Sequence, residues 1–185
     1  MWMPDVYHGA PTSVTALVGT APKIAAVVFA FRILVTGLGT VHHDWSLMFA
    51  LLAAASLLVG NLAAIMQTNI KRMLAYSTVS HMGFILLAFM AGAVGFTAGL
   101  YYAITYALMA AVSFGVLMVL STKDIECENI KDLAGLNQRH AWFAFLMLLS
   151  MFSMAGIPPL MGFYAKFGVI MALLKQGYVW LSVFA

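Results

Sequence analysis

The chain has 185 residues, of which 64% are hydrophobic and only 8% are Asp, Glu, Lys or Arg. A soluble globular domain usually has about 45–50% apolar and about 25% charged residues, so this composition indicates a membrane protein. The formal net charge of +3 comes from scattered basic residues and excludes the clustered basic face that nucleic-acid-binding proteins carry.

Apolar runs separated by turn residues predict an all-α fold, a polytopic bundle of transmembrane helices. A crossing helix needs about 20 apolar residues, so this length allows about five or six crossings. We expect one transmembrane domain over residues 1–185. Its expected spans are residues 12–36, 45–67, 71–90, 96–121 and 142–174, followed by the start of a further span at 178–185.

The span at 142–174 is too long for one straight crossing, and Gly156-Ile157-Pro158-Pro159 interrupts it. Proline lacks a backbone N–H and clashes with the preceding helical turn. We therefore expect a broken helix, with Gly156, Pro158 and Pro159 at the break. Irregular backbone at membrane depth lies within protein or beside a water-filled cavity.

The basic residues of the loops predict the orientation, because Lys and Arg accumulate on the cytoplasmic side. One side of the expected bundle has two basic residues, Arg32 and Lys175. We expect the opposite side to face the cytoplasm, because its loops contain Lys71, Arg72, Lys123, Lys131 and Arg139.

Lys23 lies near the midpoint of the first span and follows Pro22, where we expect a helix break that frees a backbone carbonyl. An ionisable side chain at this depth is costly and marks a functional site by default. A lysine there can exchange a proton near neutral pH, as a proton carrier must. The alternative is a lysine that snorkels to the interface, although about eleven residues, roughly 16 Å, separate it from either end.

Lys166 follows the Pro158-Pro159 break by seven residues. Broken helices in transporters place helix ends at ion sites, so Lys166 is a second candidate. The alternative is that Lys166 lies near the far end of the span, close to the membrane surface, where a charged side chain does not indicate a functional site.

His81 lies near the middle of the third span, next to Ser80 and one turn after Ser77. Histidine titrates near operating pH, which suits a proton shuttle, but an intramembrane histidine is equally consistent with a hydrogen-bonded packing role. Lys71 and Arg72 begin the same span, where we expect them to be interface charges that orient the helix. The alternative for Lys71 is a position at the entrance of an ion pathway.

A polar stripe on the fourth span is typical of interhelical hydrogen bonding as well as of a water path; it contains Tyr102, Thr105, Tyr106 and Ser113. His42-His43-Asp44 has no matching ligands elsewhere, so we expect no metal site. The sequence contains no phosphate-binding loop, complete dinucleotide fingerprint or cysteine cluster, and Cys127 is the only cysteine. These features favour movement of a small cation, without redox or hydrolytic chemistry in this chain.

Three blocks of sequence resemble the subunit N family of bacterial NADH-quinone oxidoreductase (respiratory complex I), which includes mitochondrial and chloroplast "subunit 2" proteins. The first block is Trp2-Met3-Pro4-Asp5-Val6-Tyr7-His8-Gly9-Ala10-Pro11 with Ala21-Pro22-Lys23-Ile24. The second runs from Gln67 to Gly83, and the third runs from Ala155 to Phe167. The blocks occur in the family order and span nearly the whole chain.

The resemblance implies an antiporter-like fold of two inverted helix repeats in a non-redox, proton-translocating subunit. Lys23 matches the family's central-helix lysine, and Lys166 matches the lysine on the second broken helix, which opens towards the periplasm. His81 falls where members often carry a relay histidine, with Lys71 at the start of that helix. The five spans would be the family's eighth to twelfth helices.

The resemblance also implies partners and location. The chain would lie in the cell inner (plasma) membrane as a multi-pass subunit, in contact with the lipid bilayer and with other membrane-arm subunits, and it would bind no nucleic acid. NADH, FMN, iron–sulfur clusters and quinone would be bound elsewhere in the complex, with no cofactor in this chain.

The family's first broken helix and an earlier glutamate-bearing helix have no counterpart here, so we expect a fragment of a longer subunit. Two other functions stay open. One is a subunit of a multisubunit sodium/proton antiporter, and the other is a membrane packing subunit that conducts nothing.

Overall fold

A computed structural model describes residues 2–121 and 128–185. Lys123 and Cys127 lie outside the described residues, as do the side chains of His43 and Asp44. The described helices are α1 (Met3–Gly9), α2 (Thr12–Phe31), the π-helical η1 (Arg32–Gly37), the 3-10 turn η2 (Gly39–Val41), α3 (His42–Ile65), α4 (Ile70–Met90), α5 (Gly92–Leu120), the 3-10 turn η3 (Ile130–Leu133), α6 (Leu136–Arg139), α7 (Ala141–Ala155), α8 (Met161–Lys175) and α9 (Val179–Phe184).

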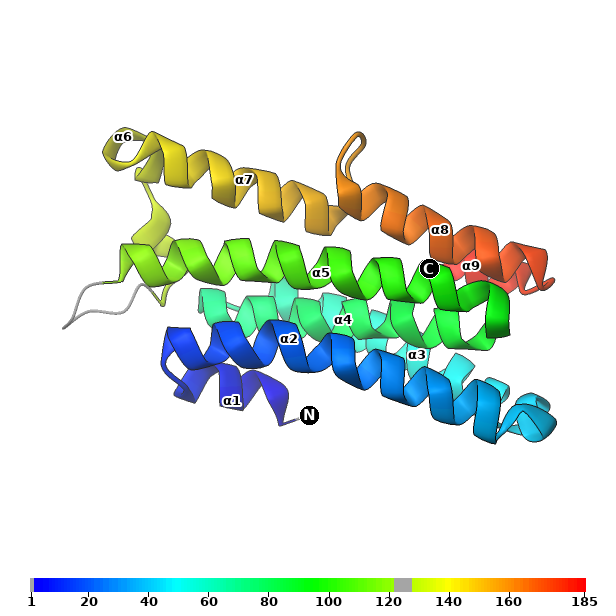
Figure 1. Ribbon diagram of the computed structural model, residues 1–185. Coiled ribbons are helices and arrows are strands. Elements are labelled where there is room, and N and C mark those ends of the chain that lie inside the picture. The colour runs from blue at the N-terminus through cyan, green and yellow to red at the C-terminus, as the bar shows by residue number, and fades with distance from the viewer. Residues whose placement is uncertain (1, 122–127) are drawn as a thin grey trace.

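The long helices lie roughly along one direction, with α5 at the centre of the bundle (Figure 1). Helix α5 packs against α2 on one side, against α7 and α8 on the other, and against α4 behind. Helix α3 packs along α4 and completes the bundle. The central helices α4 and α5 therefore bring the N-terminal and C-terminal parts of the chain together.

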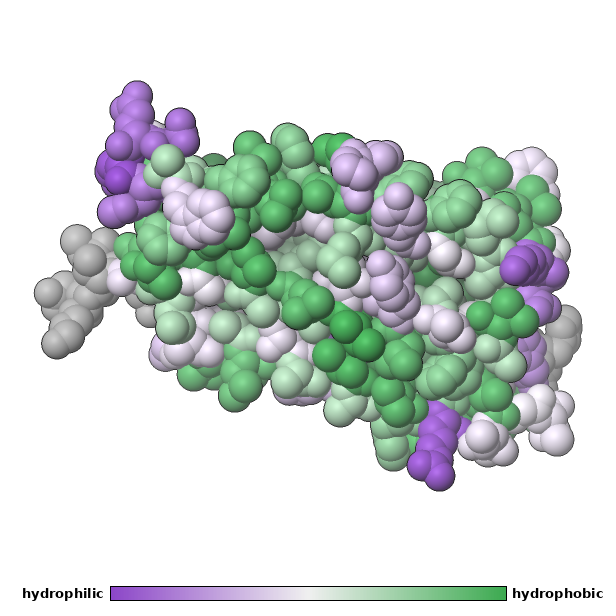
Figure 2. Space-filling view, turned by 45° about the horizontal axis from the view of Figure 1, so that its top comes forward, coloured by the Kyte–Doolittle hydropathy of each residue, from purple (hydrophilic) through white to green (hydrophobic). Residues whose placement is uncertain are grey.

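Within the described residues, four helical stretches are long and apolar enough to cross a membrane: Thr12–Gly37, Trp45–Ile65, Ile70–Met90 and Gly92–Leu120. Helix α7 is shorter but also apolar. Strongly hydrophilic residues gather towards the two ends of the molecule, while its middle is largely apolar (Figure 2). The expected all-helical, multi-pass membrane fold is confirmed.

The expected break near Pro158-Pro159 separates α7 from α8. Gly156 has φ +86°, a left-handed conformation that glycine adopts without a Cβ clash, and it ends α7. The N–H groups of Gly156 and Ile157 both donate to the Phe152 carbonyl, as in a helix-terminating motif. Pro158-Pro159 is joined by a cis peptide bond.

The expected break at Pro22 is wrong. Helix α2 runs from Thr12 to Phe31 with Pro22 inside it. Proline removes one backbone hydrogen bond, but the turns before and after Pro22 remain helical, and α2 is supported by its packing against α5. The α-helix instead gives way to a π-helix at Arg32, near the far end of the span.

Helices α3 and α4 approach closely at Gly60. A Cβ built on Gly60 would lie 2.6 Å from the backbone nitrogen of Ser80 on α4. The missing side chain therefore lets the two backbones meet, as small residues do at membrane helix interfaces.

We expect Gly60→Ala to lower the thermal stability of the detergent-solubilised protein, because the added methyl group forces α3 away from α4. Overpacking of this kind costs about 1–3 kcal/mol. The midpoint of thermal aggregation, followed by size-exclusion chromatography, measures the effect. Gly115→Ala on α5 is the matched control, because its Cβ would meet nothing within 4 Å. An equal loss of stability in both variants would contradict the close-approach explanation.

Candidate functional site

Lys23 lies between two buried tyrosine rings inside the bundle. Its Nζ donates a 3.4 Å hydrogen bond to the Tyr106 hydroxyl on α5. The same nitrogen is 4.8 Å from the Tyr106 ring centroid and 5.4 Å from the Tyr7 ring centroid, so both rings offer cation–π contacts. No ion pair to Lys23 occurs among the described residues. The lysine can therefore release a proton without leaving a carboxylate unpaired.

Hydroxyl groups continue from Lys23 into the interface of α4 and α5. The Tyr106 hydroxyl shares a short hydrogen bond with the Thr78 hydroxyl. Thr78 donates its own proton to the Leu74 carbonyl at 2.9 Å, so Tyr106 is the donor to Thr78. Lys23, Tyr106 and Thr78 thus form one chain of hydrogen bonds in which every donor points the same way.

His81 lies one turn further along α4 and contacts the same face of α5. Its Nδ1 is 2.7 Å from the Tyr102 hydroxyl, and its ring centroid is 4.9 Å from that of Tyr106. His81, Tyr102 and Tyr106 are all buried, with at most 5% of each side chain exposed. The imidazole therefore lies beside the Lys23 chain, hydrogen-bonded to the Tyr102 phenol and in tilted ring contact with Tyr106.

A cavity of about 400 Å³ connects His81 to Lys166. Its polar wall contains His81, Lys166 and three neutral groups, and its apolar wall comes from α3, α4 and α7; the polar residues are Asn61, Ser77, Ser80, His81 and Lys166. A space this large and polar can hold water molecules that have several hydrogen-bond partners. His81 and Lys166 therefore line the same cavity, with Asn61, Ser77 and Ser80 as further polar groups in its wall.

Lys166 is held at the break between α7 and α8. Its Nζ donates a 3.2 Å hydrogen bond to the carbonyl of Ala155, the last residue of α7, and lies 5.2 Å from the Phe84 ring centroid. Carbonyls at a helix C-terminus carry partial negative charge and attract cations. The two half-helices are tied together by a 3.1 Å bond from the Gly162 N–H to the Ser153 hydroxyl. The break thus supplies a neutral partner for the lysine.

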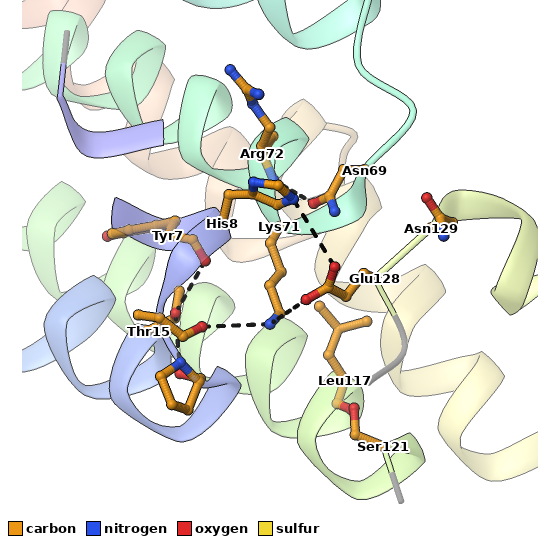
Figure 3. Close-up of polar contacts among 12 residues, drawn as sticks. Tyr7, His8, Thr15, Asn69, Lys71, Arg72, Leu117, Ser121, Glu128 and Asn129 are labelled. Atoms are coloured by element: carbon orange, nitrogen blue, oxygen red, sulfur yellow. Dashed lines mark hydrogen bonds and ion pairs between the residues drawn. The ribbon is translucent and has the colours of Figure 1, made fainter. Parts of the chain in front are cut away.

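Lys71 lies apart from these residues, at the end of the bundle where α4 begins (Figure 3). Its side chain is only 1% exposed, and its Nζ forms an ion pair of 3.2 Å with Glu128 and a 3.5 Å bond to the Ala10 carbonyl. Lys71 is therefore a buried, ion-paired lysine at the start of α4. Arg72 does point outward, 3.2 Å from Asp5.

Several of these contacts escaped the sequence analysis. The partner of Lys71, Glu128, comes from the connection after α5, and Tyr7 comes from the short helix α1. Tyr102 and Tyr106 were recognised as part of a polar stripe, and their spacing of four residues does place both on the face towards His81. Ser113, from the same stripe, instead donates to Ser150 of α7 at 3.1 Å. No cluster of three metal-ligating side chains occurs in the part of the chain that the structure describes.

Comparison with known proteins gives the family. The profile described as "NADH:quinone oxidoreductase/Mrp antiporter, TM" matches residues 1–185. NADH-quinone oxidoreductase subunit N of Neisseria gonorrhoeae is 94% identical over 185 residues, covering 100% of this chain and 38% of that protein. The subunit N of Nitrosomonas europaea is 58% identical over 186 residues, covering 100% of this chain and 39% of that protein. The chain thus spans well under half the length of these curated relatives.

Solved structures share the helical arrangement. A chain of the Mrp complex from a Dietzia species matches with a TM-score of 0.90 at 26% identity, over 99% of this chain and 34% of that chain. A chain of respiratory complex I from Thermus thermophilus matches with a TM-score of 0.83 at 33% identity, over 99% of this chain and 40% of that chain. The expected antiporter-like fold is confirmed, and the chain belongs to the NADH:quinone oxidoreductase/Mrp antiporter family of membrane proteins.

Proposed function

We propose that this chain is part of a non-redox membrane-arm subunit of NADH-quinone oxidoreductase, which moves protons across the bacterial inner membrane as electrons pass from NADH to quinone. Its 94% identity to a subunit N supports this assignment. One observation carries the transport role: Lys23 bonds the Tyr106 hydroxyl, the Tyr106 ring lies 4.9 Å from that of His81, and His81 and Lys166 line one cavity.

In the proposed path, a proton moves from Lys23 through the Tyr106 region to His81, then across the cavity to Lys166. Each lysine alternates between its charged and neutral forms, because a positive charge arriving at one site favours proton release from the next. Lys71 belongs to the mouth of the path. The end of the bundle that holds Lys71 and Arg139 faces the cytoplasm, and Lys166 delivers towards the periplasm.

Other subunits of the complex would hold NADH, FMN, the iron–sulfur clusters and quinone, and neighbouring membrane-arm subunits would be the direct partners. This chain would then contribute charge movement and no electron transfer. The side chains of the proposed path are lysine, histidine, tyrosine and threonine, which exchange protons or donate hydrogen bonds.

A multisubunit sodium/proton antiporter is the second candidate, favoured by the TM-score of 0.90 to a chain of an Mrp complex. It predicts sodium-dependent transport with no NADH-linked activity. The third candidate, a packing subunit that conducts nothing, predicts that removing the charge of Lys23 leaves transport intact.

We expect Lys23→Ala to abolish proton pumping by the complete complex in membrane vesicles, together with its NADH oxidation, while the complex still assembles. Both activities fall because electron transfer and charge movement are coupled. The quenching of a pH-sensitive dye measures pumping, and NADH absorbance measures oxidation. Lys175→Ala is the matched control, since Lys175 is an exposed lysine at the end of α8. Normal pumping by Lys23→Ala would refute the proposed path.

We expect Tyr106→Phe to slow coupled pumping by about tenfold, because it removes the hydroxyl between Lys23 and Thr78 but keeps the ring. A hydrogen bond to a charged group contributes about 1.5–3 kcal/mol, enough for a change of this size. Initial rates of dye quenching in vesicles give the comparison. Tyr101→Phe is the control, because Tyr101 is 41% exposed on the outer face of α5. Equal pumping rates in Tyr106→Phe and Tyr101→Phe would show that the Tyr106 hydroxyl is not part of the proton path.

A further inference from the structure

Three segments meet around Lys71 at one end of the bundle, and backbone hydrogen bonds fix two of them together (Figure 3). Asn69 and Asn129 form an antiparallel β-bridge. In this bridge the Ile70 N–H donates to the Glu128 carbonyl at 2.7 Å, and the Ile130 N–H donates to the Thr68 carbonyl at 3.0 Å. The bridge holds the backbone of Glu128 beside the first turn of α4, so the position of its carboxylate is set by the fold.

The carboxylate of Glu128 faces two different environments. Its Oε1 lies 3.2 Å from the Nζ of Lys71, whose side chain is 1% exposed. Its Oε2 lies 4.0 Å from the Nε2 of His8, and the side chains of His8 and Glu128 are 45% and 36% exposed. One oxygen therefore contacts a buried ammonium, while the other contacts water and a histidine that water can reach.

Helix α1 links this cluster to Lys23. His8 contacts Glu128, and its neighbour Tyr7 turns inward so that its ring lies 5.4 Å from the Lys23 Nζ. Burial raises the pKa of the Tyr7 phenol to about 12, so it stays neutral at physiological pH. A single turn of helix thus contacts both the surface carboxylate and the central lysine.

A second ion pair lies at this end of the bundle. Arg72 forms an ion pair of 3.2 Å with Asp5, whose side chain is 73% exposed. This second pair has the same length as the Lys71–Glu128 pair but lies at the surface, where an ion pair contributes little. The Asp5 carboxylate is therefore a control for removing a negative charge from a surface ion pair at this end of the bundle.

We propose that Glu128 takes up protons from the cytoplasmic side and passes them to Lys71. The proposal rests on the proton-translocating function proposed above and assigns its point of uptake. When Lys71 gives a proton inward, it becomes a neutral amine. A proton from water or from the His8 imidazolium then binds the Glu128 carboxylate, and the resulting acid donates that proton to the amine. The step restores the ammonium–carboxylate pair and moves one proton inward.

A purely structural ion pair makes a different prediction. Removing one partner of a buried pair leaves an uncompensated charge, whereas replacing both partners by neutral residues is often tolerated. A structural role therefore predicts that Glu128→Gln is defective and that the double change Lys71→Met with Glu128→Gln recovers. Proton uptake predicts that the double variant assembles but does not recover.

The test compares four variants of the complete complex in membrane vesicles: Glu128→Gln, Glu128→Asp, the double variant Lys71→Met/Glu128→Gln, and the control Asp5→Asn. Native gel electrophoresis measures assembly, and dye quenching driven by NADH measures pumping. We expect pumping to fall by about tenfold or more in Glu128→Gln and in the double variant, because general acid–base groups typically contribute factors of this size. Glu128→Asp, which keeps a carboxylate, and Asp5→Asn retain pumping.

Normal pumping by Glu128→Gln, or recovery of pumping in the double variant, would overturn the proposal. Should Glu128→Gln alone fail to assemble, the double variant decides, because it carries no uncompensated buried charge. The Lys23→Ala variant distinguishes failure of the uptake proposal from failure of the whole proposed proton path. Loss of pumping in Lys23→Ala combined with recovery in the double variant refutes uptake at Glu128 only, whereas normal pumping in Lys23→Ala refutes the whole path.

Discussion

Placing a positive charge among apolar helices is costly, and the arrangement of this bundle depends on how Lys23, Lys71 and Lys166 are accommodated. Lys23 is held by a phenol and two aromatic faces, and Lys166 by the last carbonyl of a broken helix. Lys71 is held by a carboxylate that the connection after α5 supplies. Each solution uses a different piece of structure: the tyrosines of α1 and α5, the C-terminus of α7, and the connection after α5.

The nature of the partner distinguishes the lysines. A lysine held by neutral groups can lose its proton without stranding an opposite charge, which is the requirement for a carrier deep in the membrane. Lys71 has a charged partner, so its deprotonation leaves a carboxylate behind. That carboxylate is partly exposed, and water can stabilise it until the next proton arrives. In the proposed path, the central sites and the site at the bundle end would thus serve different steps of one transfer.

The sequence was sufficient for the features that depend on composition and local chemistry. Ionisable residues stand out in apolar runs, so Lys23, His81 and Lys166 were recognisable, and Gly156 with the two prolines predicted the break. The partners were not recognisable, because the Lys23–Tyr106 and Lys71–Glu128 contacts join residues 83 and 57 positions apart. Such contacts depend on how helices pack. At Pro22 the sequence predicted a local feature that the structure lacks. The tendency of proline to break a helix is overridden there, and α2 continues through it.

The direction of the hydrogen bonds beside Lys23 constrains how a proton leaves it. Tyr106 has one hydroxyl proton and donates it to Thr78, whose own proton goes to the Leu74 carbonyl. The chain therefore ends on a carbonyl, although the Tyr106 ring faces His81 at 4.9 Å.

A proton can pass from Lys23 to His81 only after a hydroxyl rotates or a water molecule from the neighbouring cavity intervenes, because a phenol that already donates has no second proton to give. The arrangement thus gives Lys23 a hydrogen-bond partner while keeping it disconnected from His81. In the proposed path, a connection that must be made anew in each cycle would prevent protons from leaking across the membrane when no energy drives the transfer.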